Sequence, residues 1–328
     1  MKAVVFHELG GADVLGVEEW EKQTPGPGEV LIRVTSAGLN RADILFQIGR
    51  YYQKPAFPSR TGKEAAGYVE AVGEGVRYEV GDRVGILAST LNASTQGGMA
   101  EYVVAPERFV VRTPESVSDE DAGGIWMQYL TAYGALNGVV NVKSGQHVVI
   151  TASSSSVGVA AIQLVNRAGG ISIATTTSPE KVERLKELGA AHVVDTQNEK
   201  YVERVAEITG GNGADVIFDA VTGTMMAEHI EVVKRFGWIF FYGVLDVSPM
   251  SVDAGLLIGK NATLRAYSAA NLYKDSDAVR AAVDDITQAL DSDELSLVID
   301  SRFPMADVQD AILHMQSNQQ IGKIVVNP

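Results

Sequence analysis

The chain has 328 residues, of which 46% are hydrophobic and 21% are charged, with 33 glycines and no cysteine. This length and composition are typical of a globular protein with two domains. The formal charge of -14 at pH 7 argues against general binding to nucleic acid or to anionic membranes. Without cysteine the chain has no disulfides, thiol nucleophiles, thiolate zinc sites or iron–sulfur clusters. No apolar run is long enough to span a membrane, and Met1–Gly10 lacks the pattern of a signal peptide, so we expect a cytoplasmic protein.

Residues 1–110 are predicted to be rich in short β-strands, which glycine- and proline-containing turns separate. Short, closely spaced strands favour a partly closed β-barrel. A weakly helical segment, Asn40–Ile48, and an aromatic, proline-rich loop, Tyr51–Pro58, interrupt the series. The expected strands are Ala3–Phe6, Val14–Glu18, Val30–Ala37, Ala66–Val72, Arg83–Leu87 and Glu101–Val104.

From about Asp119 the pattern changes to alternating helices and strands, which predicts a parallel, doubly wound sheet. The last strand, Lys323–Val326, is expected to pair with the sheet of the first domain. One helix is expected to follow the turn Ala152–Gly158 and to end at Ala168. The other helices are expected at Gly123–Leu136, Glu180–Leu188, Tyr201–Ile208, Ala227–Arg235, Ala278–Leu290 and Met305–Gln316. The other strands are expected at Val148–Ile150, Ile171–Thr175, His192–Val194, Val216–Phe218, Trp238–Tyr242, Thr263–Tyr267 and Leu297–Ile299.

The segment His147–Asp195 has the order strand, turn, helix, strand, helix, strand, and contains the best candidate for a ligand site. Its turn of small residues, Ala152–Gly158, opens a helix, where unpaired N–H groups and the helix dipole favour a dinucleotide pyrophosphate. Only Gly158 of the usual glycine pattern is present, so an ordinary tight crossover explains this turn almost as well. The next strand ends in Thr175–Ser178, with Lys181 just beyond, where a ribose-reading carboxylate would otherwise stand. Hydroxyls and one cation suit a 2′-phosphate and favour NADPH; the alternative is a solvated loop before a helix capped by Ser178.

Nine short motifs then follow one another in the order of a known family along nearly the whole chain. Their sequences are AGLNRAD (37–43), PSRTGKEAAGYV (58–69), VGEGV (72–76), GDRV (81–84), GGMAEYV (97–103), LTAYGAL (130–136), SVGVAAIQL (156–164), LKELGAAHVVD (185–195) and IGKIVV (321–326). The chain resembles the medium-chain dehydrogenase/reductase superfamily, in its zinc-independent quinone oxidoreductase branch. The resemblance implies a GroES-like substrate domain, residues 1–122 with 267–328, and an inserted Rossmann domain, residues 123–266.

The resemblance also bears on metal and reaction. Zinc-dependent alcohol dehydrogenases of the family carry a catalytic cysteine and a histidine at the places that match Asn40 and Lys63 here. The five histidines of the chain are scattered without ligand spacing, so we expect no zinc. Without metal, a hydride from NADPH to a quinone or an α,β-unsaturated carbonyl is the reaction to expect, since these acceptors are already activated. A proton then follows from solvent or a nearby hydroxyl.

By the same resemblance, Asn40 lies beside the nicotinamide and Tyr52 lines the substrate cleft as a neutral hydrogen-bond or proton donor. The alternative for Asn40 is a helix cap, and for Tyr52 a loop aromatic that packs near Pro55 and Phe57. The remaining residues expected to contact the cofactor are Thr131, Ser154, Ser155, Ser156, Val157, Gly158, Thr177, Ser178, Lys181, Tyr242, Gly243, Val244, Tyr267 and Ser268.

Two other functions fit the same residues. One is an enoyl-thioester or xenobiotic enone reductase, and the other is a non-catalytic, NADPH-binding redox sensor, which the thinned glycine pattern keeps open. As partners we expect a small quinone or enone, with neither nucleic acid nor a membrane. We also expect a homodimer, which the resemblance implies through an edge strand such as Thr263–Tyr267.

Overall fold

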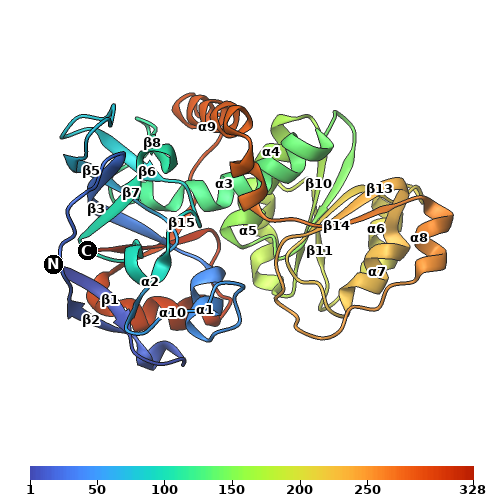
Figure 1. The fold of residues 1–328 in the computed structure, drawn as a ribbon. Helices are drawn as coiled ribbons and strands as arrows, with labels where there is room; N and C mark the ends of the chain where they lie inside the picture. The colour runs from blue at the N-terminus through green and yellow to red at the C-terminus, as the bar shows by residue number, and fades with distance from the viewer. The chain divides into compact units, whose positions relative to one another are not determined.

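A computed structural model describes residues 1–328, apart from the side chain of Asn271. The chain divides into two compact units, Met1–Met127 with Val283–Pro328, and Gln128–Ala282 (Figure 1). These boundaries fall inside two helices, α3 (Trp126–Tyr133) and α9 (Ser276–Asp291). The domain bounds expected from the sequence follow changes in element type and stay a prediction.

The first unit is built around β3, an eleven-residue strand in the middle of a mainly antiparallel sheet. The sheet order is β15-β16-β3-β5-β6-β8, with β7 also paired to β3, and a smaller sheet has the order β2-β1-β4. The alternating residues Val30, Ile32 and Val34 of β3 face the core of this unit. The strands are β1 (Lys2–Phe6), β2 (Gly16–Glu19), β3 (Glu29–Leu39), β4 (Ser59–Arg60), β5 (Ala65–Val72), β6 (Arg83–Ile86), β7 (Tyr102–Pro106), β8 (Val110–Arg112), β15 (Ile299–Pro304) and β16 (Lys323–Asn327).

The C-terminal segment completes this unit, as the sequence predicted. Strand β16 pairs antiparallel with β3, with Ile324 opposite Leu39. Val308 and Ile312 of helix α10 are buried in the same core as β3. The helices of the unit are α1 (Arg41–Gln47), α2 (Ala93–Gln96) and α10 (Val308–Gln316), with 3-10 turns η1 (Ala12–Val14), η2 (Glu107–Phe109), η3 (Ala122–Gly124) and η7 (Met305–Asp307).

The second unit contains the predicted doubly wound sheet. Its six parallel strands have the order β11-β10-β9-β12-β13-β14, so the chain reverses direction across the sheet between β9 and β12. In sheets of this kind ligands bind outside the carboxyl ends of the strands at such a reversal. The strands are β9 (His147–Ile150), β10 (Ile171–Thr176), β11 (His192–Asp195), β12 (Ala214–Asp219), β13 (Val233–Phe241) and β14 (Thr263–Ala266).

Helices cover the sheet of the second unit (Figure 1). On one face, Val149, Ile173 and Ile217 from three neighbouring strands form a core with Val205 of α6 and Ile230 of α7. Helix α4 packs on β9 and β10. The helices are α4 (Ser156–Arg167), α5 (Val182–Glu187), α6 (Tyr201–Ile208), α7 (Met225–Val232) and α8 (Ala254–Lys260); a π-helix, η4 (Gly134–Val140), follows α3, and η5 (Pro179–Lys181) and η6 (Ala269–Lys274) are 3-10 turns.

Several predicted elements differ from the observed ones, and three of them show the physical reason. The helix expected to reach Arg235 ends at Val232, because Val233 is buried and starts β13 opposite Ala214. The helix expected over 123–136 is divided into a 3-10 turn, α3 and the start of a π-helix. The strand expected at 297–299 begins at Ile299, where pairing with Lys323 of β16 sets its register.

Candidate functional site

The predicted cofactor residues of the second unit lie mostly at one edge of its sheet. Ser154–Gly158 follow β9, Thr177 and Ser178 follow β10, Tyr242–Val244 follow β13, and Tyr267 and Ser268 follow β14. Because all of these strands are parallel, the structure brings these segments to the carboxyl edge of the sheet. Thr131 lies elsewhere in the chain, on α3, and is 7% exposed.

The turn after β9 is held by short side chains. The Ser153 hydroxyl donates to the carbonyl of Ile150 (2.6 Å) and accepts from the N–H of Thr175 (2.9 Å), which ties the turn to β10. The Ser155 hydroxyl accepts from the N–H of Gly158 (3.1 Å) and caps α4. The turn is thus a rigid helix N-terminus of the kind that binds phosphate.

Gly158 is required by close packing. A Cβ atom at this position would lie 2.6 Å from the Cα of Ser153 and 2.7 Å from the carbonyl oxygen of Ala152. Ala152 itself has a positive φ of 47°, and serines occupy positions 153–156. This geometry explains how a nucleotide-type turn forms here with one glycine where several are usual.

Lys181 is a cation that forms a hydrogen bond to this turn. It is 4% exposed, and its Nζ donates to the Ser154 hydroxyl at 3.1 Å. Thr177 is exposed, and the side chain of Ser178 makes no capping hydrogen bond to the following turn. The helix cap that was the alternative role for the Ser178 side chain is therefore not formed. The buried ammonium of Lys181 adjoins the turn after β9.

Two tyrosines among the predicted residues pack against other residues of the second unit. Tyr242 stacks on Phe218, with ring centroids 4.1 Å apart. Burial raises the pKa of Tyr242, and the neighbouring Ser155 opposes that rise. The hydroxyl of Tyr267 lies against Gly134, where an added Cβ would meet it at 1.8 Å. Val244 is half exposed, at 50%.

In the first unit, Asn40 belongs to a buried polar network with Glu64 and Lys323. The amide Nδ2 of Asn40 donates to Glu64 Oε1 (3.0 Å) and to the carbonyl of Gly38 (3.0 Å), and its Oδ1 accepts from Lys323 Nζ (2.7 Å). Lys323 also pairs with Glu64 Oε1, and both side chains are at most 1% exposed. The Asn40 side chain is therefore held in place from within the unit, which leaves its predicted contact with the nicotinamide as a prediction.

Gly38 makes room for this network. A Cβ atom there would lie 2.4 Å from Glu64 Oε1 and 2.7 Å from Lys323 Cε. The second oxygen of Glu64 accepts from the backbone N–H of Met127 at 2.8 Å. The network thus ties β3, the start of β5, β16 and the first residues of α3 together.

Asp43 and Lys63 are two further buried charged groups beside this network. Asp43 is 1% exposed; its Oδ2 accepts from the backbone N–H of Asn40 at 2.9 Å, while its Oδ1 has no hydrogen-bond partner. Burial raises the pKa of Asp43 to about 6, against the attraction of Lys63. Burial lowers the pKa of Lys63, which is 2% exposed, and the charge of Asp43 opposes this shift.

The loop after α1 carries two adjacent tyrosines. Tyr52, the donor predicted from the sequence, is 64% exposed, and the two rings lie 4.2 Å apart. Burial and then Tyr52 raise the pKa of Tyr51, while hydrogen bonding from Ser89 lowers it. Tyr51 was not among the predicted site residues, because nothing in a Tyr-Tyr pair tells which ring faces the charged cluster. The structure places Tyr51 against Lys63, and Tyr52 toward solvent.

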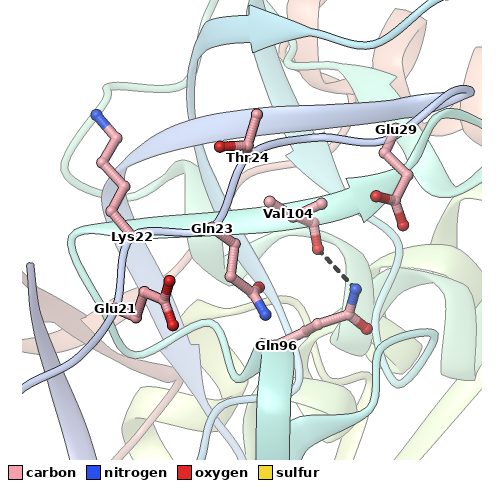
Figure 2. Close-up of a pocket in the computed structure, with 7 residues that line it drawn as sticks. All are labelled: Glu21, Lys22, Gln23, Thr24, Glu29, Gln96 and Val104. Carbon is pink, nitrogen blue, oxygen red and sulfur yellow. Dashed lines mark hydrogen bonds between the residues drawn. The ribbon is translucent and has the colours of Figure 1, made fainter.

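A separate hollow of about 380 Å³ lies in the first unit (Figure 2). Its lining residues are Glu21, Lys22, Gln23, Thr24, Glu29, Gln96 and Val104. Figure 2 shows the ammonium of Lys22 directed away from Gln96, and it pairs with Glu70 instead (3.0 Å). None of the predicted site residues lines this hollow, so it is not the candidate site.

The described residues contain neither a metal-binding cluster nor a membrane-spanning helix. No group of three or more histidine, aspartate or glutamate side chains is arranged there to hold a metal ion. Within that same part of the chain, every helix is too short or too polar to cross a membrane.

Known proteins match the chain over its whole length. A family model described as "Alcohol dehydrogenase GroES-like domain" matches residues 26–115, and one described as "Zinc-binding dehydrogenase" matches residues 156–288. The quinone oxidoreductase-like protein 2 homolog of Nematostella vectensis is 31% identical, over 99% of this chain and 88% of its own length. The synaptic vesicle membrane protein VAT-1 homolog of Rattus norvegicus is 29% identical, over 100% of this chain and 84% of its own length.

Among solved structures, Escherichia coli quinone oxidoreductase complexed with NADPH aligns with a TM-score of 0.92 at 25% identity, over 100% of both chains. This agreement confirms the predicted fold class, in which a parallel Rossmann-type sheet is combined with a GroES-like domain. The sequence and structural matches agree along the whole chain. The protein therefore belongs to the medium-chain dehydrogenase/reductase superfamily, in its quinone oxidoreductase branch.

Proposed function

We propose that the protein is an NADPH-dependent oxidoreductase that reduces a quinone or an α,β-unsaturated carbonyl by hydride transfer. The observation that carries the proposal is the turn after β9, with the buried Lys181 hydrogen-bonded to Ser154 beside it. A helix N-terminus suits the pyrophosphate, and a neighbouring ammonium suits the extra phosphate that distinguishes NADPH from NADH. The relative from Escherichia coli, which is complexed with NADPH, supports the same choice of cofactor.

The residues of the first unit do not fit a zinc ion. Lys63 stands where the zinc-dependent relatives have a histidine, and an ammonium has no lone pair with which to coordinate a metal. Asn40 stands at the place of the cysteine and is already bonded to Glu64 and Lys323. We therefore propose a reaction without metal, which suits acceptors whose carbonyl groups are activated by conjugation.

The chain's own part in this reaction is to bind, orient and supply hydrogen bonds. NADPH, when bound, supplies the hydride. Ser154–Gly158 and Lys181 would hold its phosphates, and Tyr242 with its neighbours would support the nicotinamide half. Tyr52, with Tyr51 beside it, would donate a hydrogen bond to the acceptor oxygen, where negative charge develops during transfer. The proton that completes the reduction would come from solvent or from these hydroxyls.

NADPH oxidation, followed at the nicotinamide absorbance, tests the proposal with p-benzoquinone, a long-chain 2-alkenal and a saturated aldehyde as acceptors. We expect turnover with the quinone or the alkenal and none with the saturated aldehyde. Lys181→Met is expected to weaken NADPH binding about tenfold and to leave NADH binding within about twofold, because only NADPH carries the extra phosphate. Binding of NADPH without reduction of any acceptor would favour the redox-sensor alternative.

A further inference from the structure

Lys63 is a buried cation whose surroundings do not match an ordinary ion pair. It is 2% exposed, and among the described residues no carboxylate lies within salt-bridge distance of its Nζ. Its one hydrogen-bond acceptor is Gln53 Oε1, at a long 3.4 Å. A buried ammonium with so few partners costs stability unless another interaction offsets its desolvation.

The Lys63 ammonium instead contacts two aromatic faces. Its Nζ lies 4.4 Å from the ring centroid of Tyr51 and 4.6 Å from that of Phe46. Both distances are within the range of a cation–π interaction, which strengthens where water is excluded. A positive charge thus lies against the ring of Tyr51.

A cation on the face of a phenol withdraws electron density from the ring and makes the hydroxyl a stronger hydrogen-bond donor. The electrostatic reason is that charge lost from the O–H group is stabilised by the ammonium. Ser89 and Tyr52 both interact with the Tyr51 side chain, and the backbone of Ser89 is bonded to the carbonyl of Lys63 (2.8 Å). Ser89 has a positive φ of 60°, which costs energy for a residue other than glycine. Lys63, Ser89 and Tyr51 therefore contact one another and hold each other in place.

We infer that Lys63 is a positioning residue for the reduction, which holds the Tyr51 ring and polarises its hydroxyl toward the acceptor oxygen. The inference rests on the proposed function. Lys63 itself transfers no proton and touches no substrate. The hydride comes from NADPH, the negative charge forms on the acceptor oxygen, and Tyr51 stabilises that charge by a hydrogen bond.

A double-mutant cycle tests whether Lys63 acts through the Tyr51 hydroxyl. Lys63→Met, Tyr51→Phe and the combined variant are compared with the parent protein for kcat, KM and NADPH affinity. We expect Lys63→Met to lower kcat about tenfold in the parent and less than about twofold in the Tyr51→Phe background. NADPH affinity should stay within about twofold throughout, because the residues expected to hold its phosphates, Ser154–Gly158 and Lys181, lie in the second unit. Lys63→Arg keeps the charge and should recover most of kcat.

Lys54→Met is the lysine control, since Lys54 is exposed and belongs to the loop of Tyr51, before β4; its kcat should equal that of the parent. Equal losses from Lys63→Met in both backgrounds would assign it a purely structural role and overturn the inference. Turnover by the parent protein distinguishes failure of this inference from failure of the proposed function. If the parent reduces no acceptor, the proposed function itself is wrong.

If Lys63→Met does not fold, the pH profile of the parent provides the test. The cation is needed, so kcat should fall as the pH rises through the pKa of Lys63, which lies below its ordinary value. The same alkaline fall should be absent from Tyr51→Phe, and its presence there would overturn the inference. The groups that face Lys63 or its neighbours are Asp43, Tyr51, Tyr52, Glu64 and Lys323; Tyr52→Phe is the control for the second tyrosine hydroxyl.

Discussion

Asp43 shows how burial changes the chemistry of a single residue. Its pKa is raised from 3.8 to about 6, which corresponds to about 3 kcal/mol of preference for the neutral acid. The folded protein binds this proton more tightly than the unfolded chain does. The contribution of Asp43 to the free energy of unfolding is therefore largest below pH 3.8 and is lost as the pH rises through about 6.

Asp43→Asn should remove this dependence. We expect the free energy of unfolding of the variant, relative to that of the parent, to increase by up to about 3 kcal/mol as the pH rises across the window. Urea unfolding of both proteins at pH values on either side of the window measures the difference. A difference that does not change with pH would show that the pKa of Asp43 is the same in the folded and the unfolded chain.

Two neighbouring tyrosines have different surroundings in the folded protein. Tyr51 and Tyr52 are the same amino acid at neighbouring positions, yet one is packed on Lys63 and the other is 64% exposed. The resemblance predicts that Tyr52 serves the site, and that role stays a prediction. Packing decides that Tyr51, and not Tyr52, lies against Lys63.

At the scale of elements, the turn between β9 and α4 depends on one glycine. Gly158→Ala would place a Cβ atom 2.6 Å from the Cα of Ser153, so the turn must open and its N–H groups lose their direction. We expect NADPH affinity to fall more than about tenfold, measured by nicotinamide fluorescence. Gly259→Ala in α8, where an added Cβ meets nothing within 4 Å, should leave the affinity unchanged. Equal affinities for both variants would mean that the nucleotide binds elsewhere.

The ion pair between Glu64 and Lys323 joins the last strand to the rest of its sheet. Either Glu64→Gln or Lys323→Met leaves one buried charge without its partner, which costs about 3–5 kcal/mol. The two substitutions together should cost clearly less than the sum of the single losses, since no uncompensated charge remains. Chemical unfolding of the four proteins gives these values. Strictly additive losses would show that the pair contributes no coupling.

For the whole molecule, we expect a homodimer formed through β14, which ends the sheet of the second unit. The N–H of Tyr267 donates to the carbonyl of Phe241 on β13, so by alternation the N–H of Ala266 points to the open edge. The segment before β14 also carries several exposed apolar side chains. They are Phe236, Val244, Leu245, Val247, Met250, Val252 and Ile258.

Ala266→Pro removes an outward N–H and leaves the bonds to β13 in place. Light scattering on a sizing column should show a dimer for the parent and a monomer for the variant, with little change in the thermal midpoint. A monomeric parent protein, or a variant that stays dimeric, would exclude pairing through this edge.

Much of this protein followed from the sequence by itself. The alternation of strands and helices after Asp119 predicted the parallel sheet, because each amphipathic helix must cover an apolar strand. The small residues of Ala152–Gly158 predicted a helix N-terminus at the end of β9, because only small side chains permit so tight a turn. The ordered motifs predicted the family. These features are local, or repeat along the chain, so the sequence contains them directly.

The tertiary structure decided what depends on contacts between distant segments. Lys323 meets Glu64 across 259 positions of the chain, and no local pattern predicts that pair. Helix α7 ends at Val232 because Val233 pairs with Ala214 of β12 in the sheet, although the helical pattern continues to Arg235. Lys63 lies on Tyr51 and not in solvent because folding buries the lysine. Burial shifts the pKa of both Asp43 and Lys63, and burial is a property of the folded chain alone.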